Sequence, residues 1–503
     1  MRRVLTWGLV LLLLICGAGS SVGTWFWAQF DRDTSGKVEF VNKVAVPPLA
    51  PSRVDGKGRR VFDLKAAEGE HTFGKDTMKT WGFNGGYLGP TLRAKRGEQV
   101  LVNVKNGLTE DTTVHWHGMH LPPEMDGGPH QPVAPGETWS PTWKVDQPAS
   151  TLWYHPHPHG KTMQHVYRGL AGMFIIDDPQ TSNAALPHRY GVDDIPLIVQ
   201  DKQITDGKLD EATRSMGVGI LGGTIAVNGT VGPYLDVKTE RVRLRLLNGN
   251  TARIYNFGLA DGRKFTVVGS DGGLLPRAYE TDRLVLSPGE RAEIVVTMKP
   301  GQKSVLRSYP GAAELDVIHS RFTGIDDTLD ILELRAAKTL ADSPAVPKRL
   351  VGVPRLDPKD AAQKRELVFG GETINGKSMD MTRVDYTVEK GSIEVWKVTS
   401  EDRRPHNLHV HDVQFQILTV DGKPPSPELA GWKDTIFVPP GATFEIIMRF
   451  DDFADADSPY MFHCHILLHE DEGMMGQFVV VEPGQKAGTI TPPKGANHDA
   501  HGN

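Results

Sequence analysis

One strand-and-turn pattern occurs three times along the chain, and this repeat limits the fold more than any other feature. Each copy begins at an Asn-Gly pair, continues into a strand of alternating apolar and polar residues, and ends at a Pro-Gly pair before another such strand. The Asn-Gly pairs are Asn84-Gly85, Asn228-Gly229 and Asn375-Gly376, and the Pro-Gly pairs are Pro135-Gly136, Pro288-Gly289 and Pro440-Gly441. Successive Pro-Gly pairs are roughly 150 residues apart, which is the size of a whole domain and not of a solenoid repeat.

The composition agrees with three β-domains. The 503 residues include 54 Gly and 35 Pro, which suits many short strands joined by turns. We therefore expect an all-β chain of three tandem β-sandwich domains at residues 40–178, 186–338 and 358–484. The stretch 337–360, rich in Pro, Lys and Asp, is predicted to be the linker before the third domain. Residues 485–503 are predicted to form a disordered tail.

The first residues have the features of a targeting segment. Arg2 and Arg3 precede an apolar run and then a group of small residues. We expect residues 1–30 to be a cleaved export signal or, alternatively, an uncleaved N-terminal membrane anchor, since Trp25 and Trp27 could lie at a membrane interface. The paired arginines are compatible with twin-arginine export. The protein is thus predicted to be exported to the periplasm or cell envelope, with or without an anchor.

Charge and cysteine content narrow the function further. A formal net charge of −6 argues against a nucleic-acid partner, because phosphate binding draws on an excess of basic residues. Once the targeting segment is set aside, Cys464 is the only cysteine, so no intrachain disulfide can form. In an oxidising compartment its thiol must be buried, bound to metal or reactive.

Four His-x-His pairs carry the main functional signal. Residues two apart on a strand point to the same face, so each pair places two imidazoles side by side. A single pair is more often a surface or hydrogen-bonded pair, and zinc would accept it too. Two pairs lie in the first domain and two in the third, which predicts a metal cluster at their interface, with the second domain as spacer. The pairs are His115-Trp116-His117, His155-Pro156-His157, His409-Val410-His411 and His463-Cys464-His465.

The lone cysteine belongs to a second candidate ligand set. His469 and Met474 follow Cys464, and His406 lies three residues before the third His-x-His pair. One thiolate, two imidazoles and a thioether form the ligand set of blue copper. Zinc would more often recruit several cysteines, and iron–sulfur clusters need more thiolates than the chain has. Met474 could equally be a core side chain, since Met475 beside it could serve as filler.

Alternation along this last strand predicts an electron path. If Cys464 binds one copper on one face, His463 and His465 bind other coppers on the opposite face. An electron that reaches the thiolate then has a short covalent path to the cluster. Such an arrangement joins a mononuclear electron entry to a multinuclear site, as the four-electron reduction of dioxygen requires.

These motifs resemble those of the multicopper oxidases, the family of laccases, bilirubin oxidases and bacterial cuprous oxidases. The resemblance spans about residues 60–484, and its four motifs occur in the family order. It implies three cupredoxin-like Greek-key domains with a type 1 copper in the third, and four copper ions in all, one of type 1, one of type 2 and two of type 3. The motifs are His115-Trp116-His117-Gly118, Trp153–His157, His406–His411 and His463–Met474.

The resemblance also implies a role for each site residue. His406, Cys464, His469 and Met474 would bind type 1 copper, and His115 and His409 would bind type 2 copper. The type 3 pair would be bound by His117, His155, His157, His411, His463 and His465. Asp126 and Glu470 would be the catalytic acids that supply protons to the cluster, while Cys464 carries the electrons. Without the resemblance, both acids would be interpreted as ordinary surface carboxylates.

Among subfamilies, the segments 157–162 and 470–475 look most like the bacterial copper-efflux oxidases, which would imply a part in copper homeostasis. Two departures stand against efficient Cu(I) oxidation. The methionine-rich insert of those enzymes is represented only by Met379-Asp380-Met381. Asp380 and Asp402 could match the acids that dock Cu(I), but Arg404 stands where a methionine would be expected, and a cation there should repel Cu(I).

The sequence thus predicts a monomeric multicopper oxidase that takes single electrons from a phenol, a bilirubin-like compound or Cu(I) and reduces dioxygen to water. Electrons would enter through His469. The alternatives are a non-enzymatic cell-envelope scaffold or copper-binding relative of the same fold, a copper store or chaperone, and a nitrite reductase. All twelve ligand positions are retained, which disfavours the scaffold. The His-Cys-His sequence disfavours the store, and four His-x-His pairs in one chain disfavour the reductase.

Overall fold

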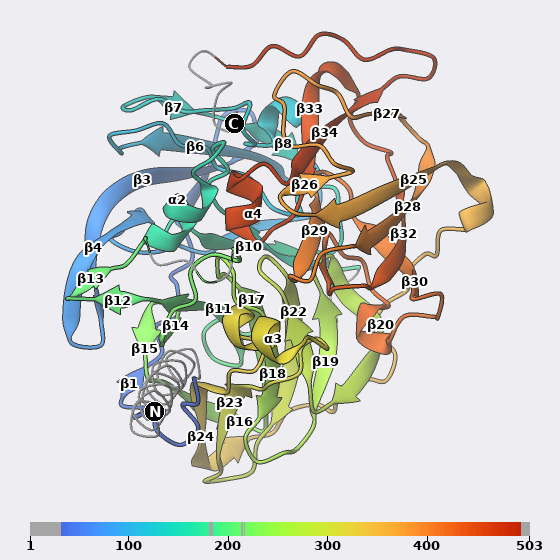
Figure 1. Cartoon of the computed structure of the whole chain (residues 1–503). Helices are drawn as coiled ribbons and strands as arrows, with labels where there is room; N and C mark the ends of the chain where they lie inside the picture. Colours follow the sequence, from blue (N-terminus) through green and yellow to red (C-terminus); the bar gives the residue numbers. More distant parts are fainter. Residues whose placement is uncertain (1–31, 181–184, 213–214, 216, 494–503) are drawn as a thin grey trace, which may run out of the picture.

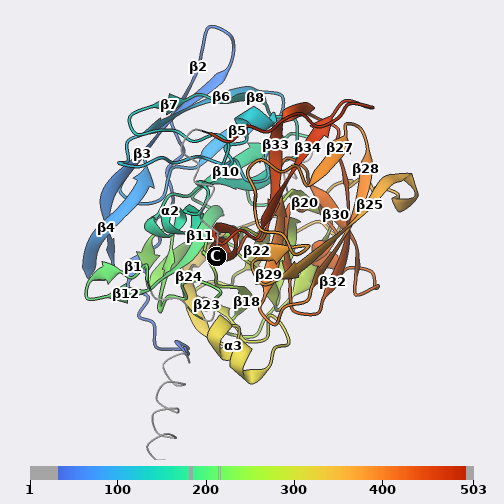
Figure 2. The same cartoon turned by 45° about the horizontal axis from the view of Figure 1, so that its top comes forward.

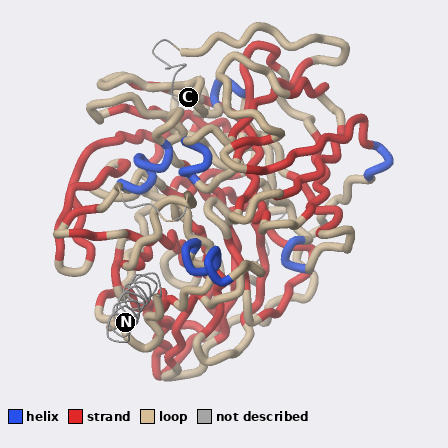
Figure 3. Tube along the Cα trace, viewed as in Figure 1, coloured by secondary structure: helices blue, strands red, loops and turns tan. Residues whose placement is uncertain are grey.

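The computed structural model describes residues 32–180, 185–212, 215 and 217–493. The predicted targeting segment, residues 1–30, lies outside them. Short strands dominate the described chain and the helices are few and brief, as Figures 1 and 3 show. Among the described residues, no helix is long and apolar enough to cross a membrane.

The strands form three sandwiches in sequence order, as predicted. In Figure 1 the first (blue to teal) and third (orange to red) lie side by side above the second (green to yellow). The first domain packs the sheet β2-β3-β6-β7, to which β4 and β8 are added, against the sheet β5-β10-β9. Its elements are β2 (Ser52–Val54), β3 (Arg60–Phe73), β4 (Asp76–Phe83), β5 (Leu92–Lys95), β6 (Gln99–Asn106), η1 (Pro123–Met125), β7 (Thr138–Trp139), β8 (Thr142–Lys144), β9 (Ser150–Tyr154), α2 (Thr162–Arg168) and β10 (Gly172–Asp177). The β2 hairpin projects from this domain in Figure 2.

The second domain packs the sheet β1-β16-β24-β23-β18-β21 against the sheet β15-β14-β11-β17-β22-β19-β20. Its elements are β1 (Asn42–Lys43), β11 (Asp194–Lys202), β12 (Ile204–Thr205), β13 (Lys208–Leu209), β14 (Thr224–Val227), β15 (Thr230–Val231), β16 (Pro233–Thr239), β17 (Arg241–Asn248), β18 (Tyr255–Leu259), β19 (Phe265–Ser270), β20 (Gly273–Thr281), β21 (Leu284–Leu286), β22 (Arg291–Thr297), β23 (Lys303–Ser308), α3 (Val317–Thr323) and β24 (Leu329–Ala341).

The third domain packs the sheet β26-β25-β28-β32-β30 against the sheet β27-β34-β33-β29-β31. Its elements are η2 (Pro358–Asp360), β25 (Ala361–Gly370), β26 (Thr373–Ile374), β27 (Tyr386–Glu389), β28 (Ile393–Ser400), β29 (His406–Val410), β30 (Phe415–Val420), η3 (Pro427–Leu429), β31 (Thr435–Val438), β32 (Thr443–Arg449), β33 (Asp455–His463), α4 (Leu467–Asp471) and β34 (Met475–Val481). Each domain has its own apolar core between its two sheets.

The three Asn-Gly turns have the same construction. Asn84, Asn228 and Asn375 adopt left-handed backbones with φ of 58°, 50° and 55°, a conformation that Asn tolerates better than most residues. Each asparagine amide bonds the neighbouring strand in the same way, accepting from one backbone N–H and donating to the carbonyl two residues earlier. The strand so held, β3, β11 or β25, pairs in parallel with β6, β17 or β28.

The three Pro-Gly turns are equivalent too. Gly136, Gly289 and Gly441 have φ of 82°, 84° and 74°. Their N–H groups donate to the carbonyls that end β6, β17 and β28, namely those of Asn106, Asn248 and Ser400. The repeat in the sequence is therefore a repeat of one strand-turn-strand unit, built once in each sandwich.

Three details differ from the predicted boundaries. β24 continues to Ala341, so the first residues of the predicted linker are strand. β1, inside the predicted first domain, pairs in parallel with β16 of the second domain. Residues 485–493 of the predicted disordered tail are placed: Ile490 is buried against Ala456, Val479 and Val481, because an apolar side chain there can cover the outer face of the last strands. Residues 494–503 lie outside the described part.

Two short helices join the first and third domains. Met163 and Val166 of α2 pack against Leu467 and Leu468 of α4. The Asp471 carboxylate, at the end of α4, accepts hydrogen bonds from the N–H groups of Thr162 (2.8 Å) and Met163, and so satisfies the first turn of α2. This contact fixes the segment that follows Cys464 against the segment that follows the second His-x-His pair.

Candidate metal centre

All eight His-x-His imidazoles gather in one buried cage between the first and third domains, and each is at most 1% exposed. His115 and His155 face each other across an isolated bridge, with distances of 2.8 and 3.1 Å between the backbone nitrogen of each and the carbonyl oxygen of the other. His409 of β29 lies opposite His463 of β33. The two pairs of each domain are therefore brought together by strand pairing, and the domain interface joins the two halves.

The ring nitrogens approach one another in three sets. In the first set, Nε2 of His155 lies 3.4 Å from Nδ1 of His117 and 3.4 Å from Nε2 of His465. In the second, Nε2 of His463 lies 3.1 Å from Nε2 of His157 and 3.2 Å from Nε2 of His411. In the third, Nε2 of His115 lies 3.3 Å from Nε2 of His409. Three, three and two imidazoles thus converge on three neighbouring points.

The chemistry of this cage fits metal ions. Burial, together with the repulsion of neighbouring rings, lowers the pKa of the imidazoles well below its usual value at His117, His155, His157, His409 and His465. Neutral imidazole is the form that donates a lone pair to a metal. Ring nitrogens that face each other across 3.1–3.4 Å are well placed to share a cation.

The second predicted ligand set lies in the core of the third domain. Sγ of Cys464 is 3.7 Å from Nδ1 of His406 and 3.5 Å from Nδ1 of His469, and all three side chains are fully buried. Met474 is fully buried in the same cluster, and its carbonyl accepts from the Cys464 N–H. Met475 packs instead with Met379, Met381 and Met461.

Protonation of the thiol also favours a metal at this set. Burial raises the pKa of Cys464 to about 12. At neutral pH a bound cation is therefore needed to favour the thiolate over the thiol.

The residues around Cys464 point in the two directions expected from the sequence. Its side chain belongs to the third-domain core, whereas those of His463 and His465 line the cage. β33 ends at His463, so beyond it the chain is held by a side chain: Oδ1 of Asn407 accepts from the His465 N–H at 2.6 Å. Asn407 in turn donates to Pro288 of the second domain.

Asp126 and Glu470 are buried, so the interpretation of both as surface carboxylates is wrong. Oδ2 of Asp126 is 2.7 Å from Nδ1 of His411, and Oε2 of Glu470 is 3.1 Å from Nδ1 of His463. Burial alone would raise both carboxyl pKa values, but the adjacent imidazoles outweigh it and lower them, that of Glu470 to about 2. Each carboxylate thus lies behind a cage histidine, within 3.1 Å of its outer nitrogen.

Both histidines beside Cys464 are closed off from solvent. Nε2 of His469, the expected electron entry, donates to the carbonyl of Gly217 at 2.8 Å. Nε2 of His406 lies 3.5 Å from the Asp402 carboxylate. A donor molecule therefore cannot touch either ring in this conformation and meets the protein over the groups that cover them.

Arg404 neutralises two acids among the groups that cover these histidines. Its guanidinium is 2.6 Å from Glu372 and 2.8 Å from Asp402. Asp380, the other acid predicted to dock Cu(I), accepts from the N–H and hydroxyl of Thr382 in its own loop.

Sequence reasoning missed three residues at the cage. Oδ1 of Asp434 lies 3.1 Å from Nε2 of His117, and the Thr435 hydroxyl lies 3.0 Å from the same atom. Arg291, from the second domain, forms two hydrogen bonds with Asp434. No motif or periodicity singles out these residues, because they follow turns that only the domain packing brings to the cage.

Family models described as "Multicopper oxidase" match residues 65–181, 202–313 and 351–484. The chain belongs to the multicopper oxidase family. Its three sandwiches are accordingly cupredoxin-like domains, and the predicted fold is confirmed.

Curated relatives include the multicopper oxidase mco of Staphylococcus haemolyticus, 37% identical over 444 residues, with 87% of this chain and 92% of that protein covered. The cell division protein FtsP of Escherichia coli is 35% identical over 443 residues, with 86% and 92% covered.

Among solved structures, a laccase from Pediococcus acidilactici is 34% identical with a TM-score of 0.80 and covers 88% of this chain and 94% of its own. A laccase-like multicopper oxidase, CueO, from Ochrobactrum is 38% identical with a TM-score of 0.79, covering 87% and 100%.

Proposed function

We propose that this multicopper oxidase couples the one-electron oxidation of a small donor to the reduction of dioxygen to water. The observation that carries the proposal is the pairing of a buried eight-imidazole cage with a separate Cys-His-His set one residue away along the chain. Copper ions bound at these positions would supply the one-electron redox chemistry and the site where dioxygen is reduced.

The three sets of ring nitrogens support a ligand assignment. His117, His155 and His465 would hold one type 3 copper, and His157, His411 and His463 the other. His115 and His409 would hold type 2 copper. In the third-domain core, His406, Cys464, His469 and Met474 would hold type 1 copper, which brings the proposed total to four ions.

The chain itself provides the connection between the two sites. Cys464 is bonded through the backbone to His463 and His465, which belong to different nitrogen sets of the cage. The side chain of Asn407 holds the His465 backbone in place. A short bonded path therefore leads from the thiolate to both type 3 sets.

Asp126 and Glu470, as ionised carboxylates, are proposed to relay the protons that water formation consumes. Each lies at the outer nitrogen of a cage histidine and within the buried interface. Their positions allow a proton to pass to the cage without exposing the imidazoles to bulk solvent.

As the electron donor, a phenolic compound fits the groups that cover His406 and His469 better than Cu(I) does. The two acids nearest His406, Asp402 and Glu372, are both paired with Arg404. A cation that approached would meet a guanidinium, whereas a neutral phenol would meet no such repulsion. The solved Ochrobactrum relative is described as having oxidase activity towards lignin model compounds, which supports the same donor class.

We also propose that the protein is exported through residues 1–30, as a cleaved signal or an anchor, and works as a monomer in the periplasm or cell envelope. The support is the arginine pair and apolar run of the N-terminal sequence.

A second candidate role is a cell-envelope scaffold, which the 35% identity to FtsP, a protein named for cell division, favours. A scaffold would not require twelve ligand-type side chains to be buried together, and here they are. Complementation of a strain that lacks FtsP separates the roles: rescue by the Cys464→Ser variant would show a scaffold function independent of oxidation.

Oxygen uptake tests the proposal. Copper-loaded protein should consume oxygen with a phenol as donor, and the same assay with Cu(I) and with bilirubin ranks the donor classes. Cys464→Ser should lose the intense blue absorption of the copper–thiolate bond and stop turnover, because serine cannot replace the thiolate. A variant that is still blue and fully active would defeat the assignment.

A further inference from the structure

The second domain reaches the cage through one arginine. Arg291, the first residue of β22, is fully buried. Its Nη1 donates to Oδ1 of Asp434 at 2.7 Å and its Nη2 to Oδ2 at 2.6 Å, a bidentate pair that crosses from the second domain to the third. Its Nε donates to the carbonyl of Thr151 in the first domain at 2.9 Å. One guanidinium therefore contacts all three domains.

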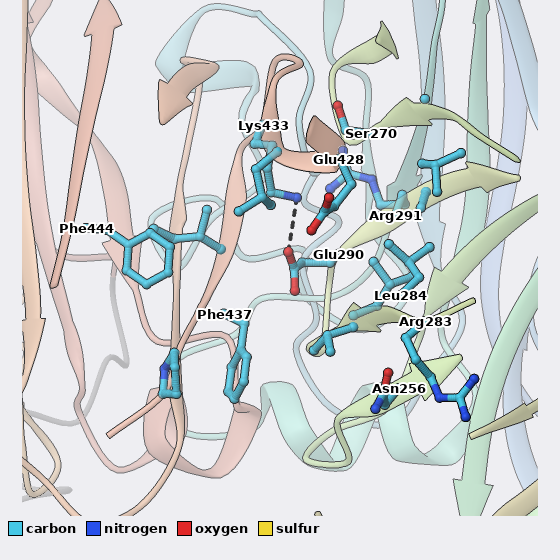
Figure 4. A pocket seen from close by; sticks show the side chains of 18 of the residues that line it. Asn256, Ser270, Arg283, Leu284, Glu290, Arg291, Glu428, Lys433, Phe437 and Phe444 are labelled. Carbon is cyan, nitrogen blue, oxygen red and sulfur yellow. Dashed lines mark ion pairs between the residues drawn. The ribbon is translucent and has the colours of Figure 1, made fainter. Parts of the chain in front are cut away.

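Arg291 lines a cavity of about 430 Å³ between the second and third domains. Figure 4 shows its polar wall, formed by Glu290, Arg291 and Lys433, with the Lys433–Glu290 ion pair of 3.0 Å as a dashed line. Lys433 also pairs with Asp271 at 2.8 Å, and Asp271 accepts from the Arg291 backbone N–H at 2.7 Å. Asp271 thus connects this ionic wall to the backbone of Arg291.

Asp434 touches one histidine of the type 3 sets and one of the type 2 set. Its Oδ1 lies 3.1 Å from Nε2 of His117, and its backbone carbonyl lies 2.9 Å from Nδ1 of His409. The Thr435 hydroxyl donates to Oδ1 of Asp434 at 2.9 Å, and so belongs to the same group.

His117 is oriented differently from the other cage histidines. It faces the cage with Nδ1, 3.4 Å from His155, whereas the other seven rings face the cage with Nε2. To offer a lone pair from Nδ1, a neutral His117 must carry its proton on Nε2. Asp434 accepts a hydrogen bond from that N–H, and Arg291 provides the counter-charge that a buried carboxylate requires.

We propose that Arg291 is a positioning residue for the copper cluster: through Asp434 it fixes the tautomer and orientation of His117 and the orientation of His409. The second domain is then part of the metal site, and its role as a spacer is only part of its function. This inference rests on the proposed function, since it assigns Arg291 a part in holding the cluster copper.

The test uses a matched arginine in the same domain. Arg253 is also fully buried and pairs with two carboxylates, Asp201 and Asp327, but has no contact with the cage among its hydrogen bonds and ion pairs. Arg291→Leu and Arg253→Leu therefore remove the same buried charge at the same depth. Asp434→Asn, which is nearly isosteric, is the second cluster variant and serves if Arg291→Leu fails to fold.

Copper retained per chain is measured against rising concentrations of a copper chelator, with the blue absorption recording type 1 copper and electron paramagnetic resonance recording type 2 copper. We expect Arg291→Leu and Asp434→Asn to weaken retention of the cluster copper by about 10- to 100-fold while the blue absorption persists. Arg253→Leu should keep its full copper content in the folded fraction.

The outcomes separate the two claims. Wild-type protein that holds four coppers, with Arg291→Leu and Asp434→Asn holding theirs equally, overturns the positioning role and leaves the proposed function intact. Loss of copper from Arg291→Leu and Arg253→Leu in parallel would do the same, since it would reflect destabilisation alone. Wild-type protein that binds no copper overturns both.

Discussion

The proposed choice of electron donor depends on one side chain, Arg404. It lies among the groups that cover the histidines beside Cys464, where it pairs with Asp402 and Glu372. It also packs against Gly217, whose carbonyl accepts a hydrogen bond from His469. The two carboxylates would otherwise present a negative surface beside His406. The sequence predicted the departure at this position, and the structure shows the two ion pairs that the arginine forms there.

We therefore predict that Arg404→Met raises the specificity constant for Cu(I) oxidation by about tenfold, because removal of one nearby positive charge leaves the two acids free to attract a cation. Phenol oxidation should change much less. Arg403→Met, which removes an exposed charge next along the chain, is the control. Equal effects of the two substitutions, or an unchanged Cu(I) rate in Arg404→Met, would contradict the role assigned to Arg404.

The turn at Gly127, directly after Asp126, holds this acid against the cage. Gly127 has φ of 76°, and a Cβ there would lie 1.8 Å from the carbonyl of Val114, the residue before His115. A side chain at this position would push apart the two segments that bring Asp126 and His115 together. Gly136, with φ of 82°, has open space around its missing Cβ.

The two glycines give a matched comparison. Gly136→Ala should lower the free energy of unfolding by about 1 kcal/mol, from the unfavourable backbone alone. Gly127→Ala should lower it by about 3 kcal/mol or more and should also lose cluster copper, because the clash with backbone cannot relax locally. Urea unfolding and copper content check this. A Gly127→Ala variant no less stable than Gly136→Ala would show that the turn can yield.

Strand β22 links the first two domains through a buried carboxylate. Glu293 forms ion pairs with Arg243 and Arg245 and accepts a 2.6 Å hydrogen bond from Thr151 of the first domain. Burial alone would raise its pKa, but the attraction of the two arginines outweighs it and lowers the pKa to about 2, from an ordinary value of 4.5. The folded protein thus binds this proton less readily than the unfolded chain.

The stabilisation from Glu293 is therefore fully present above about pH 4.5 and is lost as the pH falls towards 2. Glu293→Gln should lower the free energy of unfolding by about 3 kcal/mol at pH 7, since it leaves buried arginines underpaired. The difference in free energy of unfolding between wild type and Glu293→Gln should narrow at pH 3. Urea unfolding at both pH values would show this. Glu366→Gln, which breaks an exposed ion pair with Lys397, is the control and should have almost the same free energy of unfolding as wild type. A difference in free energy of unfolding that did not change with pH would contradict the role assigned to Glu293.

For the whole molecule, local patterns predicted the architecture well. The Asn-Gly and Pro-Gly turns identified three equivalent sandwiches because these turns depend on residues close in sequence, and the structure repeats their hydrogen bonds in each domain. The His-x-His spacing predicted paired imidazoles for the same reason.

What the sequence could not show depends on contacts between domains. Arg291, Asp434 and Thr435 come from two domains and carry no pattern of their own, so their meeting with His117 follows only from the packing. The burial of His469 likewise depends on Gly217, which is far away in the chain. Asp126 and Glu470 needed the family resemblance, because isolated carboxylates look like surface residues.

We propose that the two domains at the ends of the chain share one copper cluster fed by a single thiolate. Anomalous scattering at the copper edge, from crystals of copper-loaded protein, tests it most directly. We expect three copper peaks within the eight-histidine cage and a fourth beside Cys464 and Met474. Peaks scattered over the surface, or a cage without copper while the protein consumes oxygen, would contradict it.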